Sequence, residues 1–221
     1  MFSETCNIAL SIQQQSVLPV SSISFPHNSH VLILGVSSGF GAAAARECAR
    51  HGLNIIGVHL DRSATMPAVN ALQEELTSMG VAAHFYNVNA ADADRRAEVL
   101  DAVENELSAS PGATIRLLMH SLAFGALRPI YSDDPKNELT PAQIDMTLNV
   151  MANSLLYWTR DLIHRGLLTS GGTIVAMTSS GSTRVLPTYG AVSAAKAALE
   201  SYCRQLAYEL GPVGITANAL Q

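Results

Sequence analysis

From residue 30 onward the chain alternates short apolar segments with longer segments of helical periodicity, and this alternation restricts the possible folds more than any other feature. Short apolar runs bounded by Gly or Pro are typical of buried strands, and longer amphipathic runs are typical of helices. The predicted strands cover residues 31–34, 54–60, 81–88, 115–120, 173–178 and 215–220. The predicted helices cover residues 41–51, 67–79, 92–107, 140–165 and 190–210.

Strands that are separated by helices form right-handed β-α-β units, so the strands run parallel in one sheet. The short apolar strands favour a sheet that is covered on both faces. We therefore predict an α/β fold with a doubly wound, Rossmann-type parallel sheet over residues 30–221. Ligands of such sheets bind at the carboxyl ends of the strands, and each main motif below directly follows a predicted strand.

Composition excludes several classes of function. The net charge of −5 and the lack of a dense Lys/Arg run argue against nucleic-acid binding. The strongest apolar runs, such as residues 31–36, are too short to cross a bilayer, and the three cysteines lack metal-ligand spacing. We therefore expect no membrane partner and no metal. Residues 1–29 are rich in Ser and Gln and lack a signal-peptide pattern, so we interpret them as a flexible N-terminal extension of a cytoplasmic protein.

A glycine-rich turn lies between the first predicted strand and the first predicted helix. The turn contains Gly35, Ser37, Ser38, Gly39, Phe40 and Gly41. Glycines permit positive φ and let the backbone approach a diphosphate closely, and the helix that follows directs free N–H groups at the anion. The two serines can add hydroxyl donors. This placement predicts a dinucleotide-binding site.

The spacing G-x-x-x-G-x-G resembles the short-chain dehydrogenase/reductase family, and this resemblance implies NAD(P)H as the cofactor. In that family the residues after the second strand meet the adenosine ribose. Asp61 would favour NADH by accepting from the 2′-hydroxyl, whereas Arg62 would favour NADPH by pairing with a 2′-phosphate. Both forms of the cofactor stay open. Asn87 and Val88 occupy the place where the family usually has Asp-Val against the adenine.

The segment His120-Ser-Leu-Ala-Phe-Gly125 follows the fourth predicted strand. It resembles the enoyl-thioester reductase branch of the family rather than the more common Asn-Asn-Ala-Gly. The resemblance places Ser121, Leu122 and Ala123 beside the nicotinamide ribose. We interpret His120 itself as a packed histidine at the end of a strand, not as a catalyst.

The pair that decides the predicted chemistry is Tyr189 and Lys196. Most family members have Tyr-x3-Lys, but Val192 stands at that position here. The Tyr-x6-Lys spacing spans about two helical turns, so both side chains can share a face. This spacing resembles enoyl-acyl-carrier-protein reductases, in which the Lys holds the nicotinamide ribose and the Tyr hydrogen-bonds the thioester carbonyl. Ser179 stands where ordinary family members have their catalytic Ser.

These motifs predict an NAD(P)H-dependent oxidoreductase that reduces the C=C bond of an enoyl thioester. A carbonyl or 3-oxoacyl reductase, or an alcohol dehydrogenase of the same family, is the first alternative, because Ser179 and the ordinary glycine turn favour it. A non-catalytic dinucleotide-binding scaffold is the second alternative. Unchanged crotonyl-thioester reduction after replacement of Tyr189 with Phe would contradict the first assignment.

Three further expectations concern the second half of the chain. The family's additional Asn aligns with Met151, so neither Asn149 nor Asn153 receives a role. We interpret Tyr157 and Trp158 as packing against a partner subunit, and the two long helices, over residues 142–165 and 190–210, predict a homo-oligomer, either a dimer or a tetramer. Family members continue past the sixth strand, so we predict that this chain is a fragment without the usual C-terminal strand.

Overall fold

The computed structural model of the chain describes residues 25–26 and 28–221. The predicted extension over residues 1–29 therefore lies largely outside the described residues. Its last residue, Ser29, already belongs to the first strand and is buried.

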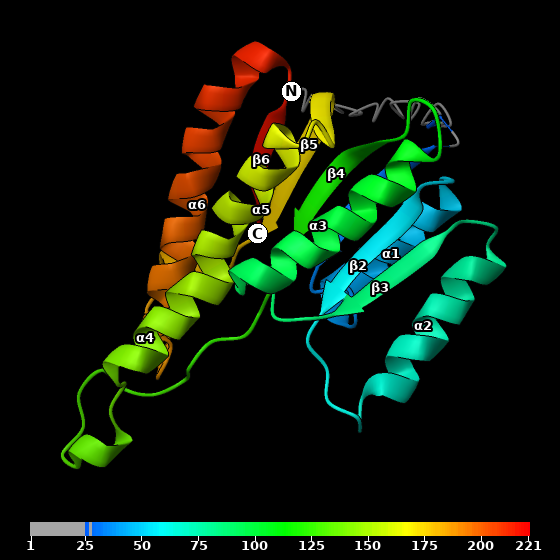
Figure 1. Cartoon of the computed structure of the whole chain (residues 1–221). Coiled ribbons are helices and arrows are strands. Elements are labelled where there is room, and N and C mark those ends of the chain that lie inside the picture. The colour runs from blue at the N-terminus through cyan, green and yellow to red at the C-terminus, as the bar shows by residue number, and fades with distance from the viewer. Residues whose placement is uncertain (1–24, 27) are drawn as a thin grey trace, which may run out of the picture.

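In the described part of the chain, six strands form one parallel sheet in the order β3-β2-β1-β4-β5-β6 (Figure 1). The strands are β1 (Ser29–Leu34), β2 (Asn54–His59), β3 (Ala83–Asn87), β4 (Thr114–His120), β5 (Leu168–Met177) and β6 (Thr216–Leu220). The strand order reverses between β1 and β4, so a crevice forms beyond the carboxyl ends of these two strands. The predicted doubly wound α/β fold is confirmed.

Helices cover both faces of the sheet, α1 and α2 on one face and α3 to α6 on the other (Figure 1). They are α1 (Gly39–Arg50), α2 (Met66–Ser78), α3 (Ala93–Ser108), α4 (Pro141–Leu148), α5 (Ser154–His164) and α6 (Gly190–Leu210), with short helical turns η1 (Pro135–Asn137), η2 (Asn149–Asn153), η3 (Ser180–Ser182) and η4 (Gly211–Val213). Strand β1 shows why its sequence is apolar throughout. Val31 and Ile33 pack on the α1 side, whereas Leu32 and Leu34 pack on the other side.

The predicted helix over residues 140–165 contains one irregular turn. It begins at Pro141 after a capping box in which Thr140 and Gln143 exchange side-chain and backbone hydrogen bonds. Residues 149–153 then form one π-helical turn, η2, before α5 starts. The Ser154 hydroxyl donates to the Val150 carbonyl over 2.7 Å. The prediction of one long helix is confirmed over residues 141–164, but periodicity did not reveal the π-helical turn within it.

Two other expectations need correction. Strand β5 begins at Leu168 rather than at residue 173, because the Gly171-Gly172 segment forms an irregularity within the strand instead of a turn before it. Trp158 is fully buried in the core of its own chain, where its indole N–H donates to the Ala90 carbonyl over 2.8 Å. The ring of Tyr157 lies under the guanidinium of Arg96, 5.3 Å from the ring centre.

None of the helices within residues 25–26 and 28–221 is long and apolar enough to cross a membrane.

Candidate active site

The glycine turn after β1 is packed so closely that side chains are excluded from it. A Cβ on Gly41 would lie 2.0 Å from the carbonyl oxygen of Gly35, and one on Gly35, whose φ is +91°, would lie 2.6 Å from the carbonyl oxygen of Ser121. Helix α1 starts at Gly39, and its N-cap residue Ser38 makes no side-chain capping bond within the described residues. The free N–H groups of this helix end fit the diphosphate of a dinucleotide.

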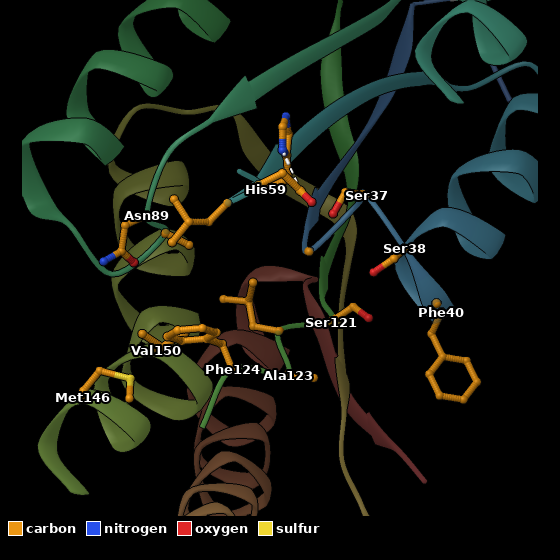
Figure 2. Close-up of a pocket in the computed structure, with 16 residues that line it drawn as sticks. Ser37, Ser38, Phe40, His59, Asn89, Ser121, Ala123, Phe124, Met146 and Val150 are labelled. Carbon is orange, nitrogen blue, oxygen red and sulfur yellow. Dashed lines mark hydrogen bonds and ion pairs between the residues drawn. The ribbon is translucent and has the colours of Figure 1, made fainter. Parts of the chain in front are cut away.

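A pocket of about 370 Å³ opens beside this turn, at the carboxyl ends of β1, β2 and β4 (Figure 2). Most of the predicted cofactor residues line it: Gly35, Ser37, Ser38, Gly39, Phe40, Asp61, Ser121, Leu122 and Ala123. The predicted residues outside the lining are Gly41, Arg62, Asn87, Val88 and Lys196. The lining residues that sequence reasoning missed are His59, Leu60, Asn89, Ala90, Phe124, Met146 and Val150.

The missed residues carried weak signals in the sequence. Met146 and Val150 come from α4 and η2, and at a spacing of four residues on a predicted helix they resemble ordinary core positions. His59 is the last residue of β2, and Phe124 belongs to the loop that we identified by resemblance. Figure 2 shows Phe124, Met146 and Val150 together on one side of the pocket, opposite Ser37 and Ser38.

Asp61 points to the pocket as an ionised carboxylate. Its Oδ2 lies 3.0 Å from Nδ1 of the buried His59, and its Oδ1 accepts from the Thr65 hydroxyl over 2.8 Å. Burial raises the pKa of Asp61, but hydrogen bonds from Ser37, Thr65 and His59 outweigh this effect, so the pKa is lowered overall. Arg62 is exposed and lies outside the lining. Of the two residues that the sequence offered for the ribose, only Asp61 faces the pocket.

Asn87 holds the end of β2 against the end of β3. Its Oδ1 accepts from the Asp61 N–H and its Nδ2 donates to the Asp61 carbonyl, both over 2.9 Å. The backbone N–H of Val88 donates to the His59 carbonyl over 2.8 Å. These contacts position Asp61 through its main chain, and its carboxylate is held separately by His59 and Thr65 at the edge of the pocket.

His120 lies at the end of β4 and is completely buried. Its Nε2 is 2.9 Å from the Ser154 hydroxyl, and that hydroxyl already donates its hydrogen to the Val150 carbonyl. Nε2–H of a neutral imidazole is therefore the donor to Ser154. Burial, with the positive charge of Lys196, lowers the pKa of His120 to about 3. This placement agrees with our interpretation of His120 as a packed residue.

Tyr189 and Ser179 meet beyond the end of β5. The Tyr189 hydroxyl donates to Ser179 Oγ over 3.3 Å, and Ser179 Oγ also accepts from the Gly181 N–H over 3.1 Å. Tyr189 is the N-cap residue of α6. Thr188, directly before it, has φ +59°, a strained conformation for a β-branched residue. Such strain is common where the chain fixes a functional side chain.

Lys196 connects this pair to the pocket. Its side chain is only 4% exposed, and its Nζ donates to the Met177 carbonyl over 2.7 Å and to the Leu122 carbonyl over 3.3 Å. Met177 ends β5, two residues before Ser179, and Leu122 lines the pocket. Burial lowers the pKa of Lys196 to about 8. The structure thus brings the predicted catalytic residues to one place, although none of them lines the pocket itself.

A family model described as Enoyl-(Acyl carrier protein) reductase matches residues 35–221. The chain belongs to the short-chain dehydrogenase/reductase family. As a member of this family it is an NAD(P)-dependent oxidoreductase, which confirms the predicted enzyme class and cofactor class.

Known relatives match this chain over different lengths. An NADPH-dependent aldehyde reductase-like protein, chloroplastic, of Arabidopsis thaliana is 28% identical over 195 residues, which are 86% of this chain and 69% of that protein. An enoyl-acyl-carrier-protein reductase (NADH), FabI, of Synechocystis sp. strain PCC 6803 is 36% identical over 107 residues, 47% of this chain and 39% of that protein. The crystal structure of a short chain dehydrogenase from Burkholderia cenocepacia J2315 in complex with NADP superposes with a TM-score of 0.73 at 27% identity, over 87% of this chain and 72% of that one. The chain therefore spans only part of each of these proteins.

Proposed function

We propose that this protein uses reduced nicotinamide to reduce the C=C bond of an enoyl thioester. The observation that carries the proposal is the arrangement of Tyr189 and Lys196 around the end of β5. Despite their unusual spacing, both contact the same short stretch, Tyr189 through Ser179 and Lys196 through the Met177 carbonyl. The resemblance of both this spacing and residues 120–124 to enoyl reductases supports the same substrate class. So does the 36% identity to the Synechocystis enoyl reductase.

The residues of the chain have distinct roles in this reaction. Bound NAD(P)H supplies the hydride that adds to the substrate. Negative charge then develops on the thioester oxygen, and the Tyr189 hydroxyl stabilises it by a hydrogen bond or by giving up its proton. Ser179 provides a second hydroxyl donor. Lys196, charged below its pKa of about 8, stabilises the negative charge that remains when Tyr189 releases a proton.

The cofactor that we propose is NADH. The ionised Asp61 carboxylate faces the pocket, where it can accept from a ribose 2′-hydroxyl and would repel a 2′-phosphate. Arg62, which would favour NADPH, lies outside the lining.

The test is a substrate profile of the purified protein with NADH or NADPH and either crotonyl or acetoacetyl thioesters. Wild-type protein should oxidise NADH with the crotonyl thioester. Tyr189→Phe removes one oriented donor, which is typically worth ~3 kcal/mol, so kcat should fall about 100-fold with little change in NADH affinity. Tyr208→Phe is the matched control, since Tyr208 lies exposed on the same helix. Undiminished crotonyl reduction by Tyr189→Phe would contradict the proposal.

Carbonyl reduction is the second candidate, and one observation favours it. Ser179 occupies the position of the catalytic Ser of ordinary family members, and it contacts Tyr189 directly. A wild-type protein that reduces the acetoacetyl but not the crotonyl thioester would establish this candidate in place of the first.

We also propose that the chain forms a homo-oligomer through α5 and α6, which lie on the same face of the sheet (Figure 1). Small exposed residues, Ala194, Ala197 and Ser201, follow one side of α6 and would allow a second helix to approach closely. Light scattering during size-exclusion chromatography should give the mass of a dimer or tetramer, and a monomer mass would contradict this proposal.

A further inference from the structure

Glu200 lies one helical turn after Lys196 on α6, and its carboxylate faces the segment that carries Ser179. The Thr178 hydroxyl donates to Glu200 Oε1 over 2.5 Å. The Ser182 side chain lies beside this carboxylate, close enough to lower its pKa. Because Glu200 is half-buried, these bonds are partly shielded from water and are stronger than they would be at the surface.

Thr178 and Ser182 are the two ends of a short loop, residues 178–182. The loop contains Ser179, whose Oγ lies 3.3 Å from the Tyr189 hydroxyl. It also contains Gly181, which packs so closely on the Tyr189 ring that an added Cβ would come within 2.4 Å of it. Any displacement of the loop therefore moves the hydrogen-bond partner of Tyr189 and removes the surface on which its ring rests.

The negative charge of Glu200 strengthens its hydrogen bonding to the loop. Burial raises the pKa of its carboxyl, but the hydrogen bonds from Ser182 and Thr178 outweigh this effect, with a contribution from the positive charge of Arg204, and the pKa is lowered overall. The carboxylate is therefore ionised at neutral pH. Hydrogen bonds to an ionised acceptor are roughly twice as strong as those between neutral groups.

We propose that Glu200 is a positioning residue that fastens both ends of loop 178–182 to α6 and so holds Ser179 and Tyr189 in place relative to Lys196. This inference rests on the proposed function, since it concerns the same site. Helix α6 then sets the geometry of the whole site, because it begins after Tyr189, carries Lys196 and fixes Ser179 through Glu200. A misplacement of ~1 Å in such a group can reduce a rate about 100-fold.

The first test compares substitutions of Glu200. Glu200→Ala should lower kcat at least about tenfold, whereas KM for NADH should change less than about twofold, because loop 178–182 lies outside the lining of the pocket. Glu200→Gln keeps one oxygen acceptor for Thr178 but loses the charge, so it should recover part of kcat. Glu209→Ala, at an exposed site of the same helix, should leave kcat unchanged. If Glu200→Ala lowers kcat and raises KM for NADH by the same factor, and Glu200→Gln restores neither, the role of Glu200 is merely structural and the proposal is overturned.

The second test removes the donors instead of the acceptor. Thr178→Val combined with Ser182→Ala leaves Glu200 in place and should reproduce the loss of kcat. Adding Glu200→Ala to this pair should cause no further loss, because residues that act as one unit are not additive. The proposal is overturned if the double variant Thr178→Val, Ser182→Ala keeps the kcat of the wild type while Glu200→Ala loses much of its kcat.

Hydrogen exchange separates this inference from the proposed function. Glu200→Ala should accelerate amide exchange in residues 178–183 at least about tenfold, with little change in the middle of α6. This result is expected whether or not an enoyl thioester is turned over. If wild-type protein reduces no thioester but loop 178–182 exchanges faster in the variant, the proposed function fails and the positioning role of Glu200 remains. Unchanged exchange in the loop would overturn the positioning role itself.

Discussion

The two halves of the site are built from different parts of the chain. In the pocket half, around the glycine turn, the main chain sets the shape: Gly35 and Gly41 lie against other backbone groups, and the Ser121 N–H donates to the Leu34 carbonyl over 2.8 Å. In the catalytic half, around loop 178–182, side chains make the contacts, as in the hydrogen bond from Tyr189 to Ser179. Each half should therefore be sensitive to a different kind of substitution. The pocket half should fail when atoms are added, and the catalytic half should fail when polar atoms are removed.

Gly41→Ala should have the largest effect. The new Cβ would lie 2.0 Å from the Gly35 carbonyl oxygen, so α1 would have to move away from the turn. We expect no measurable NADH binding by fluorescence titration and a lower melting temperature. Gly52→Asn, just past the end of α1 and outside the pocket, is the control, because a Cβ at Gly52 meets nothing within 4 Å and Asn tolerates its φ of +79°. Wild-type NADH affinity in Gly41→Ala would contradict the idea that the pocket half depends on close backbone packing.

Substitution of His120 tests how much a buried side chain next to the pocket half contributes to the stability of the fold. Its pKa is lowered from 6.5 to about 3, so between these pH values the unfolded chain binds a proton that the folded protein does not. The resulting stability is complete above pH 6.5 and is lost as the pH falls towards 3. With 1.36 kcal/mol for each pKa unit, the loss reaches at most about 5 kcal/mol. His120→Gln should lack this acid-dependent loss in denaturant unfolding measured at several pH values. Parallel stability curves for the two proteins would contradict the shift.

The sequence predicted the parts of the site that depend on local patterns. The glycine turn, residues 120–124 and Ser179 follow strands directly, so recognising the strands also placed these residues at one edge of the sheet. Tyr189 and Lys196 come later, at the start of α6, and were found by their spacing. The sequence could not identify His59, Met146 or Val150 as lining residues. Their positions depend on which side of a strand or helix faces the crevice, and an apolar residue there looks like a core residue.

The π-helical turn within the long helix was hidden for a different reason. One hydroxyl, that of Ser154, bonds to the Val150 carbonyl, and nothing in apolar periodicity records such a bond. The contact between Glu200 and loop 178–182 was equally hidden, because a Glu one turn after Lys196 resembles part of an ordinary polar helix face.

Lys196 joins the two halves, and its pH dependence tests that connection. Burial lowers its pKa from 10.5 to about 8, so between these values the unfolded chain holds more protons than the folded protein. The contribution of Lys196 to stability therefore rises with pH across this window, by up to about 3 kcal/mol. Lys196→Met should lack this rise when its unfolding free energy is compared with that of wild type between pH 8 and 10.5. The half-buried Cys48 and the buried Cys203 titrate in both proteins, so their contributions cancel in the difference.

Asp61→Asn should have the smallest effect of these substitutions. It measures how much a side chain in the pocket half contributes to the choice between NADH and NADPH. Loss of the charge should raise the ratio of kcat/KM for NADPH to that for NADH about tenfold, or ~1.4 kcal/mol. Arg62→Ala is the control and should leave the ratio unchanged, because Arg62 lies outside the lining. Asn87 holds the main chain of residue 61 through two hydrogen bonds of 2.9 Å, so the substitution alters the charge without moving the backbone. A ratio that changes with Arg62→Ala but not with Asp61→Asn would reverse the proposed preference for NADH. A ratio unchanged in both variants would mean that the pocket half selects its cofactor through the main chain alone, which makes the contrast with the catalytic half sharper.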